Sequence, residues 1–271
     1  MENGYAVEKK RRQHSSIYFV TSRKFDIPEL KIVMDAVQSA SFIPEDKTKL
    51  LLDKLAHLGG GLKGEFLKRS SLHFMTVKHT NGDIYKNVDV IQNAVEKNCR
   101  IKFNYFHINE YRKKVYAHDG AAYCEEPIGM VLDDGNYYLL CYRKEKEYAN
   151  NIKIFRIDRM DKVHITSKRI CPEALKTSKK AAEYRLQAFK MYGGEMQNVT
   201  LQFPSELIEV VYDKFGHDTQ IRRRGELFHA EVKVQISPTF WGWMLQFPTK
   251  MKIHAPEELK QEYAQWVKSA L

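Results

Sequence analysis

Tyrosine and arginine side chains gather in two adjoining segments of the chain, residues 133–143 and 154–160. Arginine offers a planar fork of hydrogen-bond donors that suits phosphate or carboxylate. Tyrosine offers a flat ring on which a base can stack. We therefore expect an aromatic and cationic patch that binds an anionic, nucleotide-like ligand. The candidate ligand-binding residues are Tyr105, Tyr123, Tyr138, Tyr142, Arg143, Arg156 and Arg159.

A structural role is the alternative for the same residues, since tyrosines can fill a small barrel and arginines can pair with nearby acids. Asp134-Gly135 between apolar runs predicts a tight hairpin, because glycine accepts the positive φ of such a turn. Alternation along the next strand then places Tyr138 and Arg143 on opposite faces. Alternation also places Arg156 and Arg159 on opposite faces of a regular strand. Both can face one ligand if the strand ends near Asp158. We expect Asp158 to hold one of these arginines rather than to act as a base.

Both segments are also part of a family resemblance. Tyr137-Tyr138-Leu139 resembles the Trp-Tyr-Leu signature of the WYL domain, with tyrosine in place of tryptophan. Supporting motifs occur in the right order: Ile101-Lys102-Phe103-Asn104-Tyr105, then Pro127, then Phe155-Arg156-Ile157-Asp158-Arg159. The chain resembles a WYL domain-containing bacterial transcriptional regulator of the DeoR/YafY-like type. The resemblance implies an Sm-like barrel in the middle of the chain and a C-terminal extension that helps to assemble a dimer.

The order of predicted elements indicates an α+β fold. A helix over residues 88–98 is followed by five predicted strands, which describe a five-stranded Sm/SH3-like barrel. The strands cover residues 100–107, 113–117, 127–132, 137–143 and 153–159. Residues 199–271 then follow the order strand, helix, strand, strand, helix, strand, helix. This order predicts a ferredoxin-like α/β sandwich.

The N-terminal part combines a basic hairpin with apolar helices. Two short strands flank Lys9-Lys10-Arg11-Arg12, as in the wing of a winged helix that contacts DNA phosphates, although a solvated basic turn is equally expected. Asp26 and Pro44 open two helices whose apolar residues pack against a second copy of the chain or against its own barrel. Relatives place three helices before such a wing. We expect most of this helix-turn-helix to be missing, by truncation or by an internal start, and duplex DNA binding to be weak.

These observations give five expected regions. They are a remnant wing (1–24), a helical linker and dimerisation region (25–84), the WYL barrel (85–168), a charged connector (169–195) and a C-terminal extension (196–271).

Bulk properties favour a polyanionic partner and give little support to catalysis. The net charge is +10 and the pI is about 9.2. The four cysteines show no metal spacing, no apolar run reaches the roughly 20 residues of a membrane span, and the polar N-terminus is no secretory signal. We therefore expect a cytoplasmic protein with reduced thiols. No GxxxxGK[ST] or HExxH motif occurs, so we expect no cofactor, no metal and no enzyme activity.

The sequence thus favours a ligand-sensing transcriptional regulator, or its effector half. A nucleotide or single-stranded nucleic acid would bind to the barrel and control DNA binding by a homodimer. The alternative is a direct single-stranded nucleic-acid-binding module without a regulatory switch. An enzyme acting on a nucleotide is a third possibility, for which no catalytic residues can be named.

Overall fold

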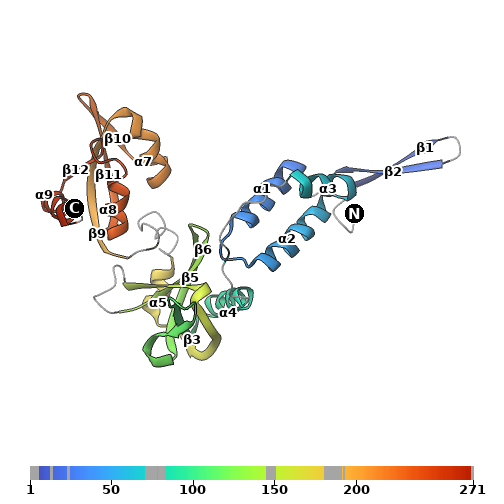
Figure 1. Ribbon diagram of the computed structural model, residues 1–271, viewed down its shortest axis with the longest axis horizontal. Coiled ribbons are helices and arrows are strands. Elements are labelled where there is room, and N and C mark those ends of the chain that lie inside the picture. The colour runs from blue at the N-terminus through green and yellow to red at the C-terminus, as the bar shows by residue number, and fades with distance from the viewer. Residues whose placement is uncertain are drawn as a thin grey trace. The chain divides into compact units, whose positions relative to one another are not determined.

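The computed structural model describes residues 6–12, 15–22, 25–70, 78, 83–144, 151–179, 191 and 193–269. The chain divides into two compact units, Met1–Gly82 and Asp83–Leu271 (Figure 1). No helix in the described ranges is long and apolar enough to cross a membrane.

The first unit begins with an antiparallel ribbon of two strands, β1 (Ala6–Arg12) and β2 (Ser15–Ser22). Lys9 is paired with Tyr18 across the ribbon, and its ammonium group lies 5.5 Å from the centre of the Tyr18 ring. The hairpin expected from the sequence is therefore present. The residues at its tip, 13 and 14, lie outside the described part of the chain.

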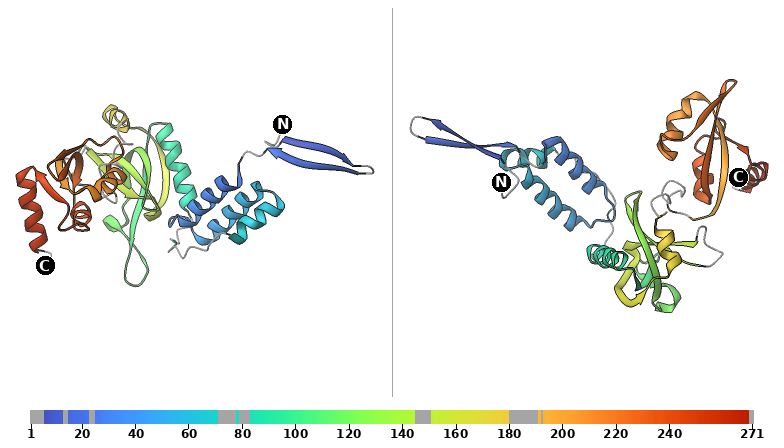
Figure 2. Two further views of the ribbon diagram at one scale, coloured as in Figure 1. Left: turned by 90° about the horizontal axis from the view of Figure 1, so that it is seen from above. Right: turned by 180° about the vertical axis from the view of Figure 1, so that it is seen from behind.

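Three helices follow the ribbon and share one small apolar core (Figure 2). They are α1 (Ile27–Ser39), α2 (Glu45–Leu58) and α3 (Gly61–Ser70). Leu30, Met34, Ala56 and Leu67 are buried in this core, with Ile27, Leu52 and Leu55 packed against it. Apolar residues that recur at helical spacing thus bury one stripe of each helix.

The sequence predicts two helices in this unit, opened by Asp26 and Pro44, and α3 was not expected. Gly60 does adopt a left-handed conformation (φ 78°) and separates α2 from α3. The chain then continues as a helix, which the glycines permit because Gly64 packs directly on α2. A Cβ atom at Gly64 would lie only 2.3 Å from the carbonyl oxygen of Ala56.

The barrel region is a half-barrel of antiparallel strands, and the helix α4 (Ile84–Glu96) precedes it. Its strands are β3 (Cys99–Ile108), β4 (Lys114–Tyr116), β5 (Tyr123–Asp133), β6 (Asn136–Tyr142), β7 (Ile152–Arg156) and β8 (Met160–Arg169). The sheet order is β4-β3-β5-β6-β7, and β8 pairs with β3.

The expected small antiparallel barrel is confirmed in the form of a half-barrel, with two local differences. The strand β8 was not anticipated, and β4 is a short hairpin extension of β3. The strand β7 ends at Arg156, and a 3-10 turn, η3 (Ile157–Arg159), leads into β8. After β8 comes α5 (Pro172–Ser178), which lies within the expected connector 169–195. Residues 180–190 and 192 of that connector lie outside the described part of the chain.

The C-terminal part is a four-stranded antiparallel sheet with helices packed on one face. Its elements are β9 (Glu195–Phe203), η4 (Ser205–Leu207), α7 (Ile208–Phe215), β10 (Ile221–Arg224), β11 (Leu227–Ile236), α8 (Pro238–Met244), β12 (Lys252–Ala255) and α9 (Glu257–Ser269). The strand order β10-β11-β9-β12 is that of a ferredoxin-like sandwich, as the element order predicted. One apolar core joins Val199 and Leu201 of the sheet to Val211 of α7 and Trp241 of α8.

The close contact at Gly64 gives a test of the helical unit. We expect Gly64→Ala to destabilise this unit by about 1–3 kcal/mol, because the added methyl group must push α3 away from α2. Gly61→Ala is the matched control, since a Cβ at Gly61 meets nothing within 4 Å. Hydrogen exchange of the α2 and α3 amides measures both. Equal protection in the two variants would contradict the assigned packing.

Candidate ligand-binding surface on the half-barrel

Four aromatic rings from three strands pack together on one face of the half-barrel. Phe103 of β3 stacks on Tyr123 of β5, with ring centres 5.5 Å apart and an interplanar angle of 7°. Phe155 of β7 meets the edges or faces of Phe103, Tyr105 and Tyr123 at centre distances of 5.1–5.3 Å. Phe103 and Phe155 are buried, whereas Tyr105 and Tyr123 are half-buried. The two tyrosines therefore form the accessible side of a fixed aromatic cluster.

A lysine and a histidine border this aromatic cluster. The ammonium group of Lys153 lies 5.0 Å from the centre of the Tyr123 ring, a cation–π distance. The exposed ring of His118 also contacts Tyr123, and the two ring centres lie 5.0 Å apart. His118 has a left-handed conformation (φ 51°), and the turn that carries it is held by a 2.6 Å bond from the Asn104 side chain to the carbonyl oxygen of Gly120.

Arg159 lies near the same cluster, at the end of the 3-10 turn after β7. Burial raises the pKa of the Tyr105 hydroxyl, while the N–H group of Arg156 and the charge of Arg159 lower it. The Arg159 side chain is half-buried and makes no ion pair or hydrogen bond with the residues that the structure describes. A guanidinium group in this state can bind an anion without first giving up a carboxylate.

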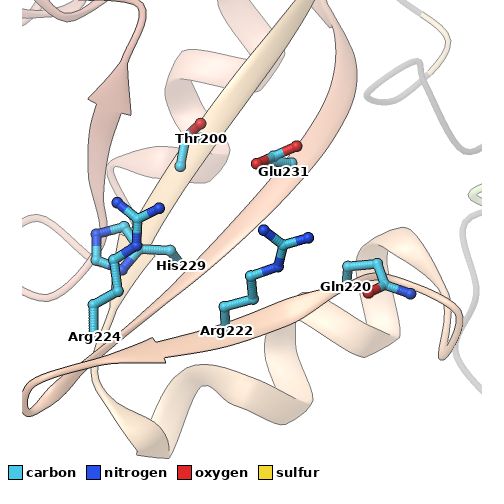
Figure 3. Close-up of a pocket in the computed structure, with 6 residues that line it drawn as sticks. All are labelled: Thr200, Gln220, Arg222, Arg224, His229 and Glu231. Atoms are coloured by element: carbon cyan, nitrogen blue, oxygen red, sulfur yellow. The ribbon is translucent and has the colours of Figure 1, made fainter.

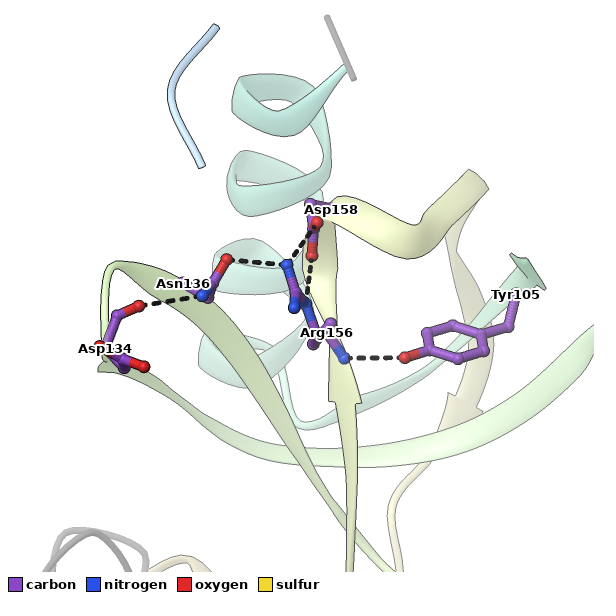
Figure 4. A network of polar contacts seen from close by, with 5 residues as sticks. All are labelled: Tyr105, Asp134, Asn136, Arg156 and Asp158. Atoms are coloured by element: carbon purple, nitrogen blue, oxygen red, sulfur yellow. Dashed lines mark hydrogen bonds and ion pairs between the residues drawn. The ribbon is translucent and has the colours of Figure 1, made fainter. Parts of the chain in front are cut away.

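Arg156 is engaged by the protein itself (Figure 4). Its Nε and Nη2 atoms donate to the two carboxylate oxygens of Asp158 at 3.0 and 2.9 Å, and Nη2 also donates to Asn136 at 2.8 Å. Asp158 is only 8% exposed. The backbone N–H group of Arg156 donates to the Tyr105 hydroxyl at 3.2 Å. Arg156 therefore neutralises a buried acid and fixes one ring of the aromatic cluster.

Arg143, the residue after β6, is engaged in a similar way. It makes a two-pronged ion pair with Glu125 of β5, at 3.0 and 2.6 Å, and Glu125 is 2% exposed. Such fork-to-fork pairs are strong and geometrically specific. An external anion would have to compete with a buried carboxylate for this guanidinium.

Tyr138 and Tyr142 lie on the opposite face of β6. Tyr142 is buried in a second apolar cluster with Leu140, Ile170 and Ala174, and Tyr138 packs against that cluster. Burial is the largest cause that raises the pKa of each of these two hydroxyls. The sequence-predicted set thus separates into three groups: Tyr105, Tyr123 and Arg159 together, Arg143 and Arg156 in ion pairs, and Tyr138 and Tyr142 in the second cluster.

Sequence reasoning did not select His118, Lys153, Phe103 or Phe155. Strand alternation could have indicated Lys153 and Phe155, because they lie two residues apart on β7 and share the face of Leu139 and Cys141 across the strand pair. His118 gave no signal, since it depends on an irregular turn. All four cysteines are free thiols.

On the N-terminal ribbon, Lys9, Lys10 and Arg11 are exposed. The side chain of Arg12 lies outside the described part of the chain.

The half-barrel is thus an antiparallel sheet with an aromatic face that is bordered by Lys153 and Arg159. Residues 86–165 match the WYL domain family, and the chain is a WYL domain protein. No curated protein matches the sequence.

Two solved structures are similar to the whole chain. One is the proteasome accessory factor B/C (PafBC) of Arthrobacter aurescens, at 15% identity and a TM-score of 0.34, covering 94% of this chain. The other is described as a CRISPR Cas-related protein, at 14% identity and a TM-score of 0.42, covering 96% of this chain. The chain spans 36% of the PafBC chain and 67% of the CRISPR Cas-related chain.

The two arginines after β7 should respond differently to truncation. We expect Arg156→Ala to lower the free energy of unfolding by about 1–3 kcal/mol, because buried Asp158 keeps its charge and loses two hydrogen bonds. Arg159→Ala is the matched control and should change stability by less than about 0.5 kcal/mol. Denaturant unfolding of both variants measures the difference, and equal losses would contradict the assigned roles.

Proposed function

We propose that this WYL domain protein is a ligand-sensing transcriptional regulator, or the effector half of one. Its effector would be a nucleotide or a short single-stranded nucleic acid bound at the aromatic cluster of the half-barrel. One observation carries the proposal: the half-buried Tyr123 ring lies about 5 Å from both Lys153 and His118, and Arg159, which makes no ion pair with the described residues, lies near Tyr105.

The chemistry of this surface suits a base joined to a phosphate. Stacking of a base on an aromatic side chain contributes about 1–3 kcal/mol and tolerates any base. Arg159 can present two parallel donors to a phosphate, and Lys153 adds a second positive charge next to the ring. Tyr105 and Tyr123 are held by buried phenylalanines, so little side-chain entropy is lost when a ligand binds.

The remaining residues of the candidate set have supporting roles in this proposal. Arg156 positions Tyr105 through its backbone N–H group and keeps Asp158 neutralised. Arg143 neutralises Glu125 in the same way. Tyr138 and Tyr142 anchor the far face of β6.

Regulation requires that the effector bind two arrangements of the protein with different affinity. We infer that the basic ribbon, with Lys9, Lys10, Arg11 and Arg12, contacts DNA phosphates in a homodimer. A second candidate function is direct binding of single-stranded nucleic acid without a switch, which the same stacking surface and the net charge of +10 also favour. DNA binding that depends on residues 1–24 would support the regulator, whereas strand binding that survives their removal would support the second function.

Effector binding should depend on Tyr123 and Arg159. We expect Tyr123→Leu and Arg159→Ala each to weaken binding of a short single-stranded oligonucleotide by roughly tenfold or more, as stacking or a charge-assisted contact is lost. Fluorescence anisotropy measures the affinity. Arg69→Ala removes the same charge from α3 in the other unit and is the control. Arg159→Lys should recover part of the loss.

A homodimer is part of this proposal, and the structure changes the residues expected to form it. Leu30 and Leu55 belong to the internal core of the three helices. Other apolar side chains are exposed there instead: Leu62 is 88% exposed and Phe66 is 64% exposed, both on α3. Exposed apolar patches of this kind mark interaction sites in soluble proteins.

We therefore expect Leu62→Glu and Phe66→Glu to favour the monomer of 31.8 kDa. The reason is that a charge in an apolar interface loses its hydration without gaining a partner. Sedimentation at micromolar concentration measures the change. Lys63→Glu, an exposed neighbour on the same helix, controls for the added acid. If the wild-type protein is already a monomer, the proposed homodimer is wrong.

A further inference from the structure

The C-terminal sheet has one face without helices, and this face carries a polar cavity. The apolar residues of β9, β10 and β11 point into the core beneath α7 and α8, so the residues between them point to the other side. A cavity of about 170 Å³ opens there and is lined by Thr200, Gln220, Arg222, Arg224, His229 and Glu231 (Figure 3).

His229 has an unused hydrogen-bond donor in this cavity lining. The residue is 7% exposed, and its Nε2 atom lies 3.1 Å from Nε2 of Gln202. The amide nitrogen of glutamine can only donate, so Nε2 of His229 accepts, and the neutral ring carries its hydrogen on Nδ1. The Nδ1 atom is buried and has no partner among the described residues. Buried donors are rarely left in this state without a ligand or an ordered water.

The two arginines of the cavity are also unengaged. Arg222 and Arg224 lie two residues apart on β10 and therefore on the same face of the sheet, and Arg222 is paired with His229 across the strands. Neither guanidinium makes an ion pair with the residues that the structure describes. Arg223, between them, points the other way and donates from Nε to the carbonyl oxygen of Gly225 at 2.9 Å.

Burial lowers the pKa of His229, and the charges of His254 and Arg224 lower it further. Arg224 is thus close to the His229 ring, as Figure 3 also shows. The exposed ring of His254 lies 4.7 Å from that of His229, at an interplanar angle of 76°. Glu231 supplies the one carboxylate of the lining, so the cavity combines two cations, one anion and a buried N–H donor.

We propose that this cavity is a second binding site, separate from the half-barrel surface, for the phosphate ester group of a nucleotide or a single-stranded nucleic acid. The phosphate oxygens accept hydrogen bonds from the guanidinium groups of Arg222 and Arg224, next to the His229 ring. Glu231 and Thr200 accept hydrogen bonds from hydroxyl or amino groups of the same ligand. His254 offers an exposed ring to an unstacked base.

The chemistry distinguishes this ligand from a simple polyanion. A carboxylate inside the cavity repels a second phosphate placed near it, so dense anionic surfaces fit poorly. A nucleotide-like ligand has one phosphate per sugar, which suits the two arginines. Its sugar and base also carry hydrogen-bond donors, which suit Glu231.

The test uses the full chain in three binding titrations: inorganic phosphate, a nucleoside monophosphate and octathymidylate. Isothermal calorimetry gives the affinities, and the ring nitrogen resonances of His229 report on the cavity by NMR. We expect Arg222→Ala and Arg224→Ala each to weaken phosphate-ester binding by roughly tenfold or more. Arg223→Ala is the matched control, because it removes the same charge from the same strand on the other face.

All titrations are repeated with Tyr123→Leu and Arg159→Ala in place, which removes the contribution proposed for the half-barrel. Equal affinity for the monophosphate and the oligonucleotide identifies a free nucleotide as the ligand class, whereas binding of the oligonucleotide alone identifies a single strand. The proposal is overturned if His229 resonances do not respond to any of the three ligands. It is also overturned if Arg223→Ala weakens binding as much as Arg222→Ala does.

Discussion

The half-barrel depends on two carboxylates that are buried and must therefore be paired. Glu125 and Asp158 lie inside the protein, where an uncompensated charge is strongly unfavourable. Each is held by the fork of one arginine, Arg143 or Arg156. The second pair has a further effect, because Arg156 is the last residue of β7 and Asp158 lies in the following 3-10 turn. The ion pair spans the point where the strand stops, so it fixes the direction in which the chain leaves the sheet.

This turn determines what Arg159 can do. In a regular strand, Arg156 and Arg159 would point to opposite faces, and only one could accompany Tyr105. The 3-10 turn removes that restriction and brings the charge of Arg159 near the Tyr105 ring, whose hydroxyl already accepts the backbone N–H of Arg156. One arginine thus serves the fold, and its neighbour three residues later makes no ion pair with the described residues. Residues of the same type in one short motif have different tasks because one of them lies beside a buried acid.

Patterns of alternation and element order predicted most of this fold from the sequence. The order of elements in residues 199–271 determined the ferredoxin-like sandwich, since few topologies satisfy that order. Prediction failed where packing contradicts local propensity: no helix was expected in the glycine-rich segment that follows α2, yet Gly64 permits α3 to approach Ala56. For the candidate site, Tyr138 and Tyr105 were equivalent candidates from the sequence, and only the tertiary structure places Tyr138 against the cluster around Leu140 and Ala174.

The same distinction between engaged and unengaged cations applies to both sheets of the second unit. The net charge of +10 favours a polyanionic partner but does not indicate where on the surface it binds. Ion pairs within the protein reduce that choice, because a guanidinium already bound to a carboxylate gains little from exchanging it for a phosphate. Three arginines without an ion pair among the described residues, Arg159 on the half-barrel and Arg222 and Arg224 on the C-terminal sheet, lie near an aromatic or imidazole ring. A ligand with both a charge and a flat ring system uses the two groups together, and a simple anion uses only one.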